Sequence, residues 1–185
     1  MGNRHGKLAG INAVLAVIVL AGGGGCGAMY PPLEVVDYVD ITRYAGRWYE
    51  IARYPNSFEQ GCVGVTADYT LQDNGRVEVV NTCIESSLDG PTRTIRGSAR
   101  VVDDTTNAKL KVSFFGPFEG DYWIIDLDED YQYAVVGDPS RKFLWILSRT
   151  PQLDEAVYES IREWLPTVEY DPEQLILVEQ PEQTD

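Results

Sequence analysis

Histidine is almost absent from this chain: among 185 residues the only one is His5. It lies within residues 1–25, which have the pattern of an export signal, so we expect the mature protein to contain no imidazole. Without imidazole, neither the common Ser-His or Cys-His nucleophile pairs nor a histidine metal site can form. The sequence therefore argues against the usual hydrolases, and it predicts no metal site and no cofactor.

Positive charge is also scarce. Fifteen Lys and Arg residues face 29 Asp and Glu residues, which gives a formal net charge of −14. Loss of Arg4 and Lys7 with the signal leaves thirteen basic residues and a charge of −16. A protein so acidic repels a phosphate backbone, so nucleic acid is excluded as a partner. Adaptation to a salty environment is an alternative reason for the acidic surface.

The first 25 residues predict a secretory signal. A basic start is followed by an apolar run, residues 8–21, that is too short to span a bilayer. The small residues directly before Cys26 resemble the bacterial lipoprotein signal, in which the cysteine becomes the lipid-bearing N-terminus, although Gly23 stands where a branched apolar residue is usual. Lipidation of Cys26 would attach the protein to a membrane surface. The alternative is plain secretion after cleavage in the glycine run.

Behind a lead-in segment (26–45), in which residues 30–41 contain proline and should be extended, the chain consists of short runs of β-type residues separated by turn signals. Asp73-Asn74-Gly75 is the clearest hairpin turn, because Asn and Gly both tolerate positive φ. The eight predicted strands span residues 47–54, 62–71, 76–83, 93–102, 108–115, 122–127, 131–137 and 143–149.

Alternation along these strands directs one set of side chains inward. The set mixes small residues and a polar Asn81 with aromatics, which is looser than the core of a sandwich. We therefore expect an all-β fold in which eight antiparallel strands form an up-and-down barrel with room for one ligand. The predicted ligand-binding wall consists of Ala67, Tyr69, Val79, Asn81, Ala99, Val112, Phe114, Tyr122, Ile124 and Trp145. For each of these residues, ordinary barrel core is the alternative.

One amphipathic helix is predicted after the barrel. Thr150 is its expected N-cap and Pro151 its first residue, and apolar residues recur every fourth position from Leu153 to Leu165. The helix should pack outside the barrel. Residues 175–178 are expected to add a short strand, and residues 181–185 form an acidic tail.

Arg149 shares the parity of apolar residues in the last predicted strand. A buried guanidinium is unfavourable without a partner. The indole of Trp48 would be a suitable one, with a gain of about 0.5–2 kcal/mol. The alternative is that Arg149 emerges into solvent at the end of the strand.

Three ordered stretches resemble the motifs of the lipocalin family: Gly46-Arg47-Trp48-Tyr49-Glu50-Ile51, residues 127–139 and residues 144–151. Residues 58–62, 66–69 and 111–118 are most similar to bacterial outer-membrane lipocalins and apolipoprotein D. The resemblance covers residues 30–180 and implies a lipocalin calyx over residues 46–180 with the helix outside. It also implies that Gly46, Trp48 and Arg149 close one end, with Arg149 packed across Trp48.

The cysteines allow one disulfide. If Cys26 is lipidated, Cys62 and Cys83 remain as a pair in an exported protein, where oxidation is expected. They flank the 73–75 turn, but a two-residue turn leaves them about four residues out of register, so a bulge is needed. Closing this loop would contribute about 3 kcal/mol. The alternative is two free thiols.

The leading functional hypothesis is binding, storage or transport of a small hydrophobic ligand, such as a fatty acid or lysophospholipid, in the bacterial cell envelope. The protein would be exported and held at the outer membrane through Cys26. The loops 55–61 and 116–120 should line the mouth, where Phe58, Phe115 and Phe118 could serve lipid transfer or association with a second copy. Isolated exposed aromatics are the alternative. Similar bacterial lipocalins suggest a homodimer.

Two other classes of function compete with it. In the first, Glu50 and Asp126 both point inward with raised pKa values and act as catalytic carboxylates on a lipid. A single buried Glu50, satisfied by a tyrosine or Asn81, is the simpler explanation of the same pattern. The second is a structural protein of the envelope with an empty cavity.

Overall fold

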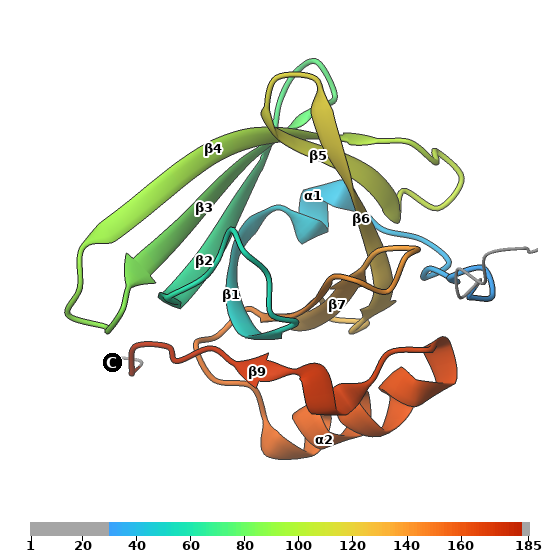
Figure 1. Ribbon diagram of the computed structural model, residues 1–185. Helices are drawn as coiled ribbons and strands as arrows, with labels where there is room; N and C mark the ends of the chain where they lie inside the picture. The colour runs from blue at the N-terminus through green and yellow to red at the C-terminus, as the bar shows by residue number, and fades with distance from the viewer. Residues whose placement is uncertain (1–29, 183–185) are drawn as a thin grey trace, which may run out of the picture.

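Eight antiparallel strands close into a barrel in the computed structural model, which describes residues 30–182 (Figure 1). Each strand pairs with the next, and β1 pairs with both β2 and β8, which closes the ring. The strands are β1 (Gly46–Arg53), β2 (Cys62–Leu71), β3 (Val77–Glu85), β4 (Thr92–Val101), β5 (Lys109–Phe115), β6 (Phe118–Leu127), β7 (Tyr133–Gly137) and β8 (Leu144–Ser148). The predicted barrel is confirmed.

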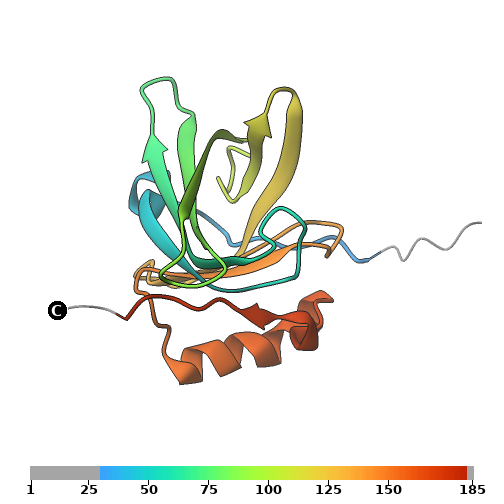
Figure 2. The ribbon, with the colours of Figure 1, turned by 60° about the vertical axis from the view of Figure 1, so that its left-hand side comes forward.

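Turn residues explain most strand ends. At the β2–β3 turn, the Gly75 amide donates to the carbonyl of Gln72, and Gly75 has φ +77°. The prediction was wrong at β6, which begins at Phe118 rather than near residue 122. Phe118 pairs with Phe115 across Gly116-Pro117, so residues 116–120 form a tight hairpin and not a loop. Figure 2 shows the β2–β3 and β5–β6 hairpins projecting from the same side of the barrel.

Bulges interrupt the regular alternation that the sequence suggests. Register shifts occur between Glu50 and Ala52, Val63 and Thr66, Val112 and Phe115, and Ile124 and Asp126. Each adds one residue to a strand, so the side chains beyond it change faces. Residues past a bulge therefore lie on the opposite side from the one that simple parity predicts.

A short helix, α1 (Ile41–Tyr44), precedes β1, just after the part of the lead-in that was expected to be extended. The Asp40 side chain accepts hydrogen bonds from the amides of Thr42 and Arg43, which is the usual arrangement of an N-cap. The helix carries Tyr44 to the end of the barrel, where this side chain is buried.

The long helix α2 (Glu155–Trp164) packs outside the barrel, as expected, but it starts later than predicted. Asp154 is its N-cap, because its carboxylate accepts from the amides of Ala156 and Val157. Thr150 instead donates its hydroxyl to the carbonyl of Gln152. No helix in the part of the chain that the structure describes is long and apolar enough to cross a membrane.

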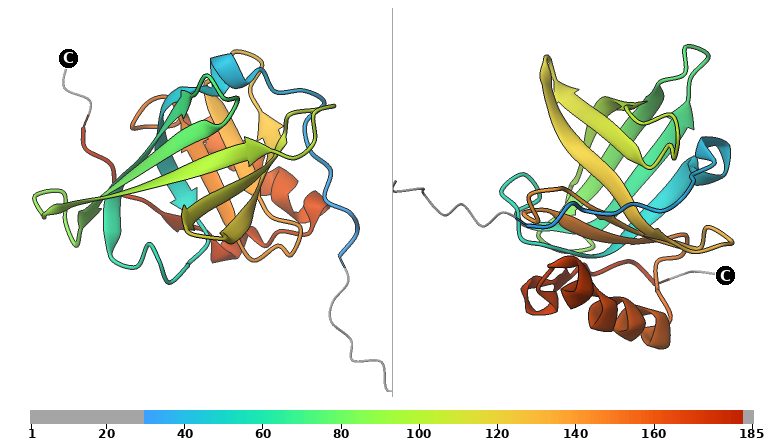
Figure 3. Two further views of the ribbon diagram at one scale, coloured as in Figure 1. Left: turned by 90° about the horizontal axis from the view of Figure 1, so that it is seen from above. Right: turned by 90° about the vertical axis from the view of Figure 1, so that its right-hand side faces the viewer.

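The C-terminal segment returns to the barrel through the 3₁₀ helices η1 (Leu165–Val168) and η2 (Pro172–Gln174). The predicted extra strand is present as β9 (Ile176–Leu177), which pairs with Ala52 and Arg53 of β1. Figures 2 and 3 show α2 and this segment on one side of the barrel. The signal, Cys26 and the last three residues lie outside the described part of the chain.

Two hydrophobic clusters result from this arrangement. The outer cluster lies between the barrel wall and α2, and its largest fully buried members are Leu144, Ile146, Ile161, Leu165 and Tyr170. The interior cluster fills the barrel. Its buried members are Val39, Tyr44, Trp48, Tyr69, Val77, Val79, Ala99, Ala108, Leu110, Ile124, Tyr131, Ala134, Val136 and Leu147.

Candidate functional site

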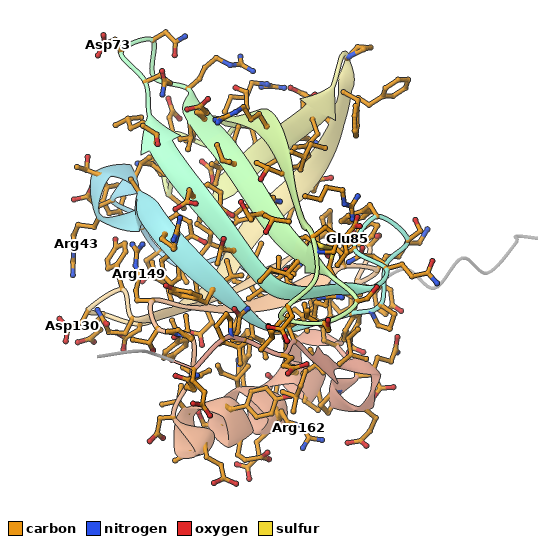
Figure 4. The ribbon with its side chains drawn as sticks, turned by 90° about the vertical axis from the view of Figure 1, so that its left-hand side faces the viewer. Arg43, Asp73, Glu85, Asp130, Arg149 and Arg162 are labelled. Atoms are coloured by element: carbon orange, nitrogen blue, oxygen red, sulfur yellow. A yellow bond between two sulfur atoms is a disulfide. The ribbon has the colours of Figure 1, made fainter. Side chains whose placement is uncertain are left out.

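One end of the barrel is sealed around Trp48, whose side chain is fully buried. The Arg149 guanidinium lies 3.9 Å from the centre of the indole ring, and the indole N–H donates to the carbonyl of Tyr44 at 2.8 Å. Figure 4 shows Arg149 and Arg43 at this end and Glu85 at the other. Burial lowers the pKa of Arg149, which nevertheless stays cationic because an arginine titrates far above neutral pH.

Arg149 also connects three segments of backbone. Its guanidinium donates to the carbonyls of Arg43, Tyr44, Arg47 and Tyr131, at 2.7 to 3.2 Å. These carbonyls belong to α1, to β1 and to the turn before β7. A flat cation with five donors can hold them together while it covers the indole.

Gly46 makes the turn from α1 into β1 possible. Its φ of +96° is accessible to glycine and unfavourable for residues with a side chain. A Cβ at this position would lie 3.4 Å from Nη1 of Arg149, which is ordinary contact. The backbone angle, rather than lack of space, therefore accounts for glycine here.

Nine of the ten predicted wall residues lie in or against the interior cluster. Tyr69, Val79, Ala99 and Ile124 are buried in it, and the others pack on it while remaining half-buried: Ala67, Val112, Phe114, Tyr122 and Trp145. The tenth, Asn81, pairs with Ala67 on β2 and Ile95 on β4. Its side-chain oxygen is buried and has no hydrogen-bond partner among residues 30–182.

Strand alternation could not identify Tyr44 as an interior residue, because Tyr44 lies in α1. Its hydroxyl lies 2.7 Å from that of Tyr122, which in turn lies 3.0 Å from that of Tyr69. We call these residues the tyrosine triad. Burial raises the pKa of all three hydroxyls, so they are neutral at physiological pH. The only signal for Tyr44 was its position just before the Gly-Arg-Trp motif.

A small enclosed cavity of about 20 Å³ lies beside the triad. It is lined by Ile41, Tyr44, Ala45, Tyr69, Val77, Ala99, Leu110, Val112 and Tyr122. This volume suits one water molecule, whereas a lipid-sized ligand needs roughly 300 Å³ or more. This cavity by itself is therefore too small for such a ligand.

A buried charge cluster lies towards the mouth. Glu50 and Arg53 are only 4% and 5% exposed, and Oε1 of Glu50 accepts from Nη1 of Arg53 at 2.7 Å. The partner of Glu50 is thus Arg53, not a tyrosine or Asn81 as expected. Arg53 was missed because the bulge at Ile51 turns it to the same side as Glu50. Burial and the carboxylate of Glu59 raise the pKa of Glu50, and Arg53 opposes this shift.

Arg53 and Glu59 connect the loop 54–61 to the barrel. Arg53 donates to the carbonyls of Glu59 and Cys62, and its Nε, which has no hydrogen-bond partner among the described residues, lies 3.9 Å from the Glu59 carboxylate. The same carboxylate accepts from the indole N–H of Trp145 at 3.2 Å and from the side chain of Asn56. Trp145, a predicted wall residue, is therefore held at the mouth by this loop.

The alternative in which Asp126 points inward together with Glu50 is wrong. Beyond the bulge in β6, Leu127 packs on the interior cluster while Asp126 lies beside Tyr133, which packs on the outer cluster. The described residues also contain no group of three or more His, Cys, Asp or Glu side chains that could hold a metal.

The disulfide between Cys62 and Cys83 is confirmed. Val63 pairs with Ile84 but Thr66 pairs with Thr82, so two residues of β2 oppose Cys83. This is the bulge that the cysteine spacing required, and Gly64 at φ +54° supplies its unusual backbone angle. One consequence is that Val65 joins the disulfide in a separate small cluster instead of the barrel interior.

The three predicted rim aromatics do not form one patch. Phe58 packs near Phe143 and Trp145, with ring centres 5.8 and 6.5 Å apart, and so belongs to the mouth. Phe115 and Phe118 lie at the tip of the β5–β6 hairpin and are 70% and 79% exposed.

Comparison with known proteins identifies the class of protein that this barrel defines. A lipocalin-like domain matches residues 39–180. The chain is 40% identical over 171 residues to the outer membrane lipoprotein Blc of Escherichia coli, covering 91% of this chain and 94% of that one. It is 34% identical over 159 residues to apolipoprotein D of Mus musculus, covering 81% and 80%. The chain belongs to the lipocalin family.

Two further comparisons agree with this assignment. Temperature-induced lipocalin-1 of Arabidopsis thaliana is 43% identical over 140 residues, covering 71% of this chain and 74% of that one. The solved structure of insecticyanin from the tobacco hornworm Manduca sexta has a TM-score of 0.67 and 24% identity, covering 83% of this chain and 87% of that one. At this identity the second likeness concerns the fold alone.

Proposed function

We propose that this lipocalin binds and carries a small amphipathic ligand, such as a fatty acid or lysophospholipid, with the apolar chain inside the barrel. The observation that carries the proposal is the asymmetry of the interior. One end is sealed by Arg149 over Trp48, and the other holds half-buried aromatic side chains attached to a loop. Ligand pockets have this composition, mainly apolar with a few oriented polar groups.

The charge cluster is the proposed position of the ligand's polar group. The Nε of Arg53 has no hydrogen-bond partner among residues 30–182, and a carboxylate or phosphate oxygen could accept from it. Entry would require the Glu59 carboxylate to release Trp145, because the loop 54–61 holds this indole in place. The resemblance to outer membrane lipoproteins supports a location in the cell envelope, with Cys26 as the lipid-bearing residue.

The test is a titration of delipidated protein with hexadecanoic acid and with a lysophospholipid of the same chain length, followed by native mass spectrometry. Trp145→Ala removes a wall residue at the mouth, and Ala67→Trp fills the interior, so both should weaken binding about tenfold or more. Tyr158→Phe is the control, because this side chain packs in the outer cluster. Unchanged affinity in both wall variants would show that the site lies elsewhere.

A protein with no affinity for either lipid would contradict the proposal and favour a structural role in the envelope. Asp126, the second carboxylate of the catalytic alternative, lies beside Tyr133 outside the interior, so the pair of Glu50 with Asp126 does not form. The same mass spectra would nevertheless detect turnover, since a cleaved lysophospholipid changes mass.

A further inference from the structure

The tyrosine triad contains more donors than its own contacts use. Three hydroxyls carry three hydrogens, but two contacts join them, at 2.7 and 3.0 Å, and each contact uses one hydrogen. The described residues offer these hydroxyls no other partner within hydrogen-bond distance. One O–H group therefore has no acceptor inside the barrel, which is unfavourable in an apolar interior.

The free donor lies near the sealed end of the barrel, next to the enclosed cavity. The rings of Tyr44, Tyr69 and Tyr122 line this cavity, and the remaining lining is aliphatic. Asn81 lies on β3, one inward-facing position nearer the mouth than the partner of Tyr69. Its side-chain oxygen is buried and has no hydrogen-bond donor among the described residues. The interior thus presents a free donor and a free acceptor along otherwise apolar walls, and neither is needed for carrying a plain hydrocarbon chain.

Charge determines which ligand group could accept a hydrogen bond from the free hydroxyl of the triad. The cation nearest to the triad is Arg149, but its N–H groups already donate to four backbone carbonyls behind Trp48. An anionic group brought to the triad would lose its hydration without gaining a counter-ion. A hydroxyl or carbonyl oxygen would gain a hydrogen bond at much smaller desolvation cost.

We propose that the hydroxyls of Tyr44, Tyr69 and Tyr122 form a recognition site for an uncharged oxygen function at the far end of the ligand's chain. The inference rests on the proposed function, since it takes the charged group of the ligand to lie at the mouth. It adds a substrate class: amphipaths that carry a second, neutral polar group, such as a hydroxyl, at the end opposite to the head.

The experiment compares matched pairs of ligands. Fatty acids of ten to eighteen carbons and their counterparts with a hydroxyl on the last carbon are titrated into delipidated protein, and the ratio of the two dissociation constants is measured at each length. The triple variant Tyr44→Phe/Tyr69→Phe/Tyr122→Phe removes all three hydroxyls and leaves the rings. Because no polar atom of the triad remains unsatisfied, this variant should fold, which thermal unfolding would verify.

At the chain length that reaches the triad, the wild type should prefer the hydroxylated ligand. Its ratio of the two dissociation constants should favour that ligand about fivefold more than the ratio of the triple variant does. The single variant Tyr122→Phe should keep the preference for the hydroxylated ligand. It removes the hydroxyl that bridges Tyr44 and Tyr69, and both of these remain as donors. Tyr158→Phe, in the outer cluster, should behave as wild type.

Equal ratios in the wild type and the triple variant at every chain length would overturn the inference while leaving the proposed function intact. A preference lost in Tyr122→Phe but kept in the triple variant would overturn it as well. If neither series of ligands binds to any variant, the proposed function fails and the inference fails with it.

Discussion

The guanidinium of Arg149 lies 3.9 Å over the ring of Trp48, and it joins the residue that follows the last barrel strand to the first strand. The same guanidinium donates to the carbonyls of Arg43 and Tyr44, so α1 is fixed to the barrel by this contact as well. The lipocalin motif around Trp48 therefore closes the end of the barrel only together with Arg149, which lies far along the chain.

Arg149→Ala should lower the free energy of unfolding by about 2–4 kcal/mol, because several backbone carbonyls lose a charged donor and the indole loses its cation. Arg149→Lys should recover only part of this loss, since an ammonium cannot reach the same carbonyls together. Urea denaturation measures both values. Arg96→Ala, which removes an exposed ion pair with Glu78, is the control and should change stability by less than about 1 kcal/mol. Equal losses at the two positions would contradict the role of Arg149.

Gly46→Ala should destabilise the protein by about 1–3 kcal/mol, because φ of +96° is strained for alanine. Gly120→Ala in β6 is the matched control: its φ is not positive, and the nearest atom to an added Cβ is 4.0 Å away. Thermal unfolding of the two variants tests the difference. A neutral Gly46→Ala would show that this turn can adopt another backbone conformation.

The Cys62–Cys83 disulfide should contribute about 2–4 kcal/mol, since it closes a loop with a sequence separation of 21 residues. A reducing agent should lower the urea midpoint of the wild type and leave that of Cys62→Ala/Cys83→Ala unchanged. A variant that still responds to the reductant would show that its effect does not arise from this bond.

Glu50 should make stability depend on pH. Burial and Glu59 raise the pKa of Glu50, so its proton is bound more tightly in the folded state than in the unfolded one. The bound proton stabilises the folded state fully at pH values below the pKa of Glu50 in the unfolded chain, about 4.3. This stabilisation is lost as the pH rises through the higher pKa of Glu50 in the folded protein. The melting temperature of Glu50→Gln relative to the wild type should therefore increase from pH 4 to pH 7.

The matched control for this measurement is the exposed Glu129, which lies in the turn between β6 and β7. The difference between Glu129→Gln and the wild type should stay nearly constant over the same interval. A Glu50→Gln difference that is constant, or that decreases as the pH rises, would contradict the raised pKa.

The strands, the barrel and nine wall positions could be predicted because alternation and turn chemistry are local. The inward position of Val79 and Ala99 could be predicted from the alternation of their immediate neighbours. The turn at Gly75 could be predicted from the residue type alone. The outer helix was also visible in its periodicity. Its first residue was not, because Thr150 and Asp154 are both good N-caps and the chain uses the second.

Bulges account for most of what could not be predicted. One extra residue in a strand reverses the faces beyond it, and its position depends on a partner strand that the local sequence does not identify. Arg53 was therefore missed and Asp126 was assigned to the wrong side. Tyr44 was missed for a different reason: it belongs to a helix of four residues that was not predicted from the sequence.

Pairing of β1 with β8 has a kinetic consequence. The β2–β3 hairpin can form from neighbouring residues, whereas β1 meets β8 only after most of the barrel sequence has been arranged. Contacts between such distant segments carry a high loop-closure cost, and we expect the β1–β8 pairing to form after the transition state. Changes at Arg149 should therefore hardly alter the refolding rate, and should instead shorten the lifetime of the native state by accelerating unfolding.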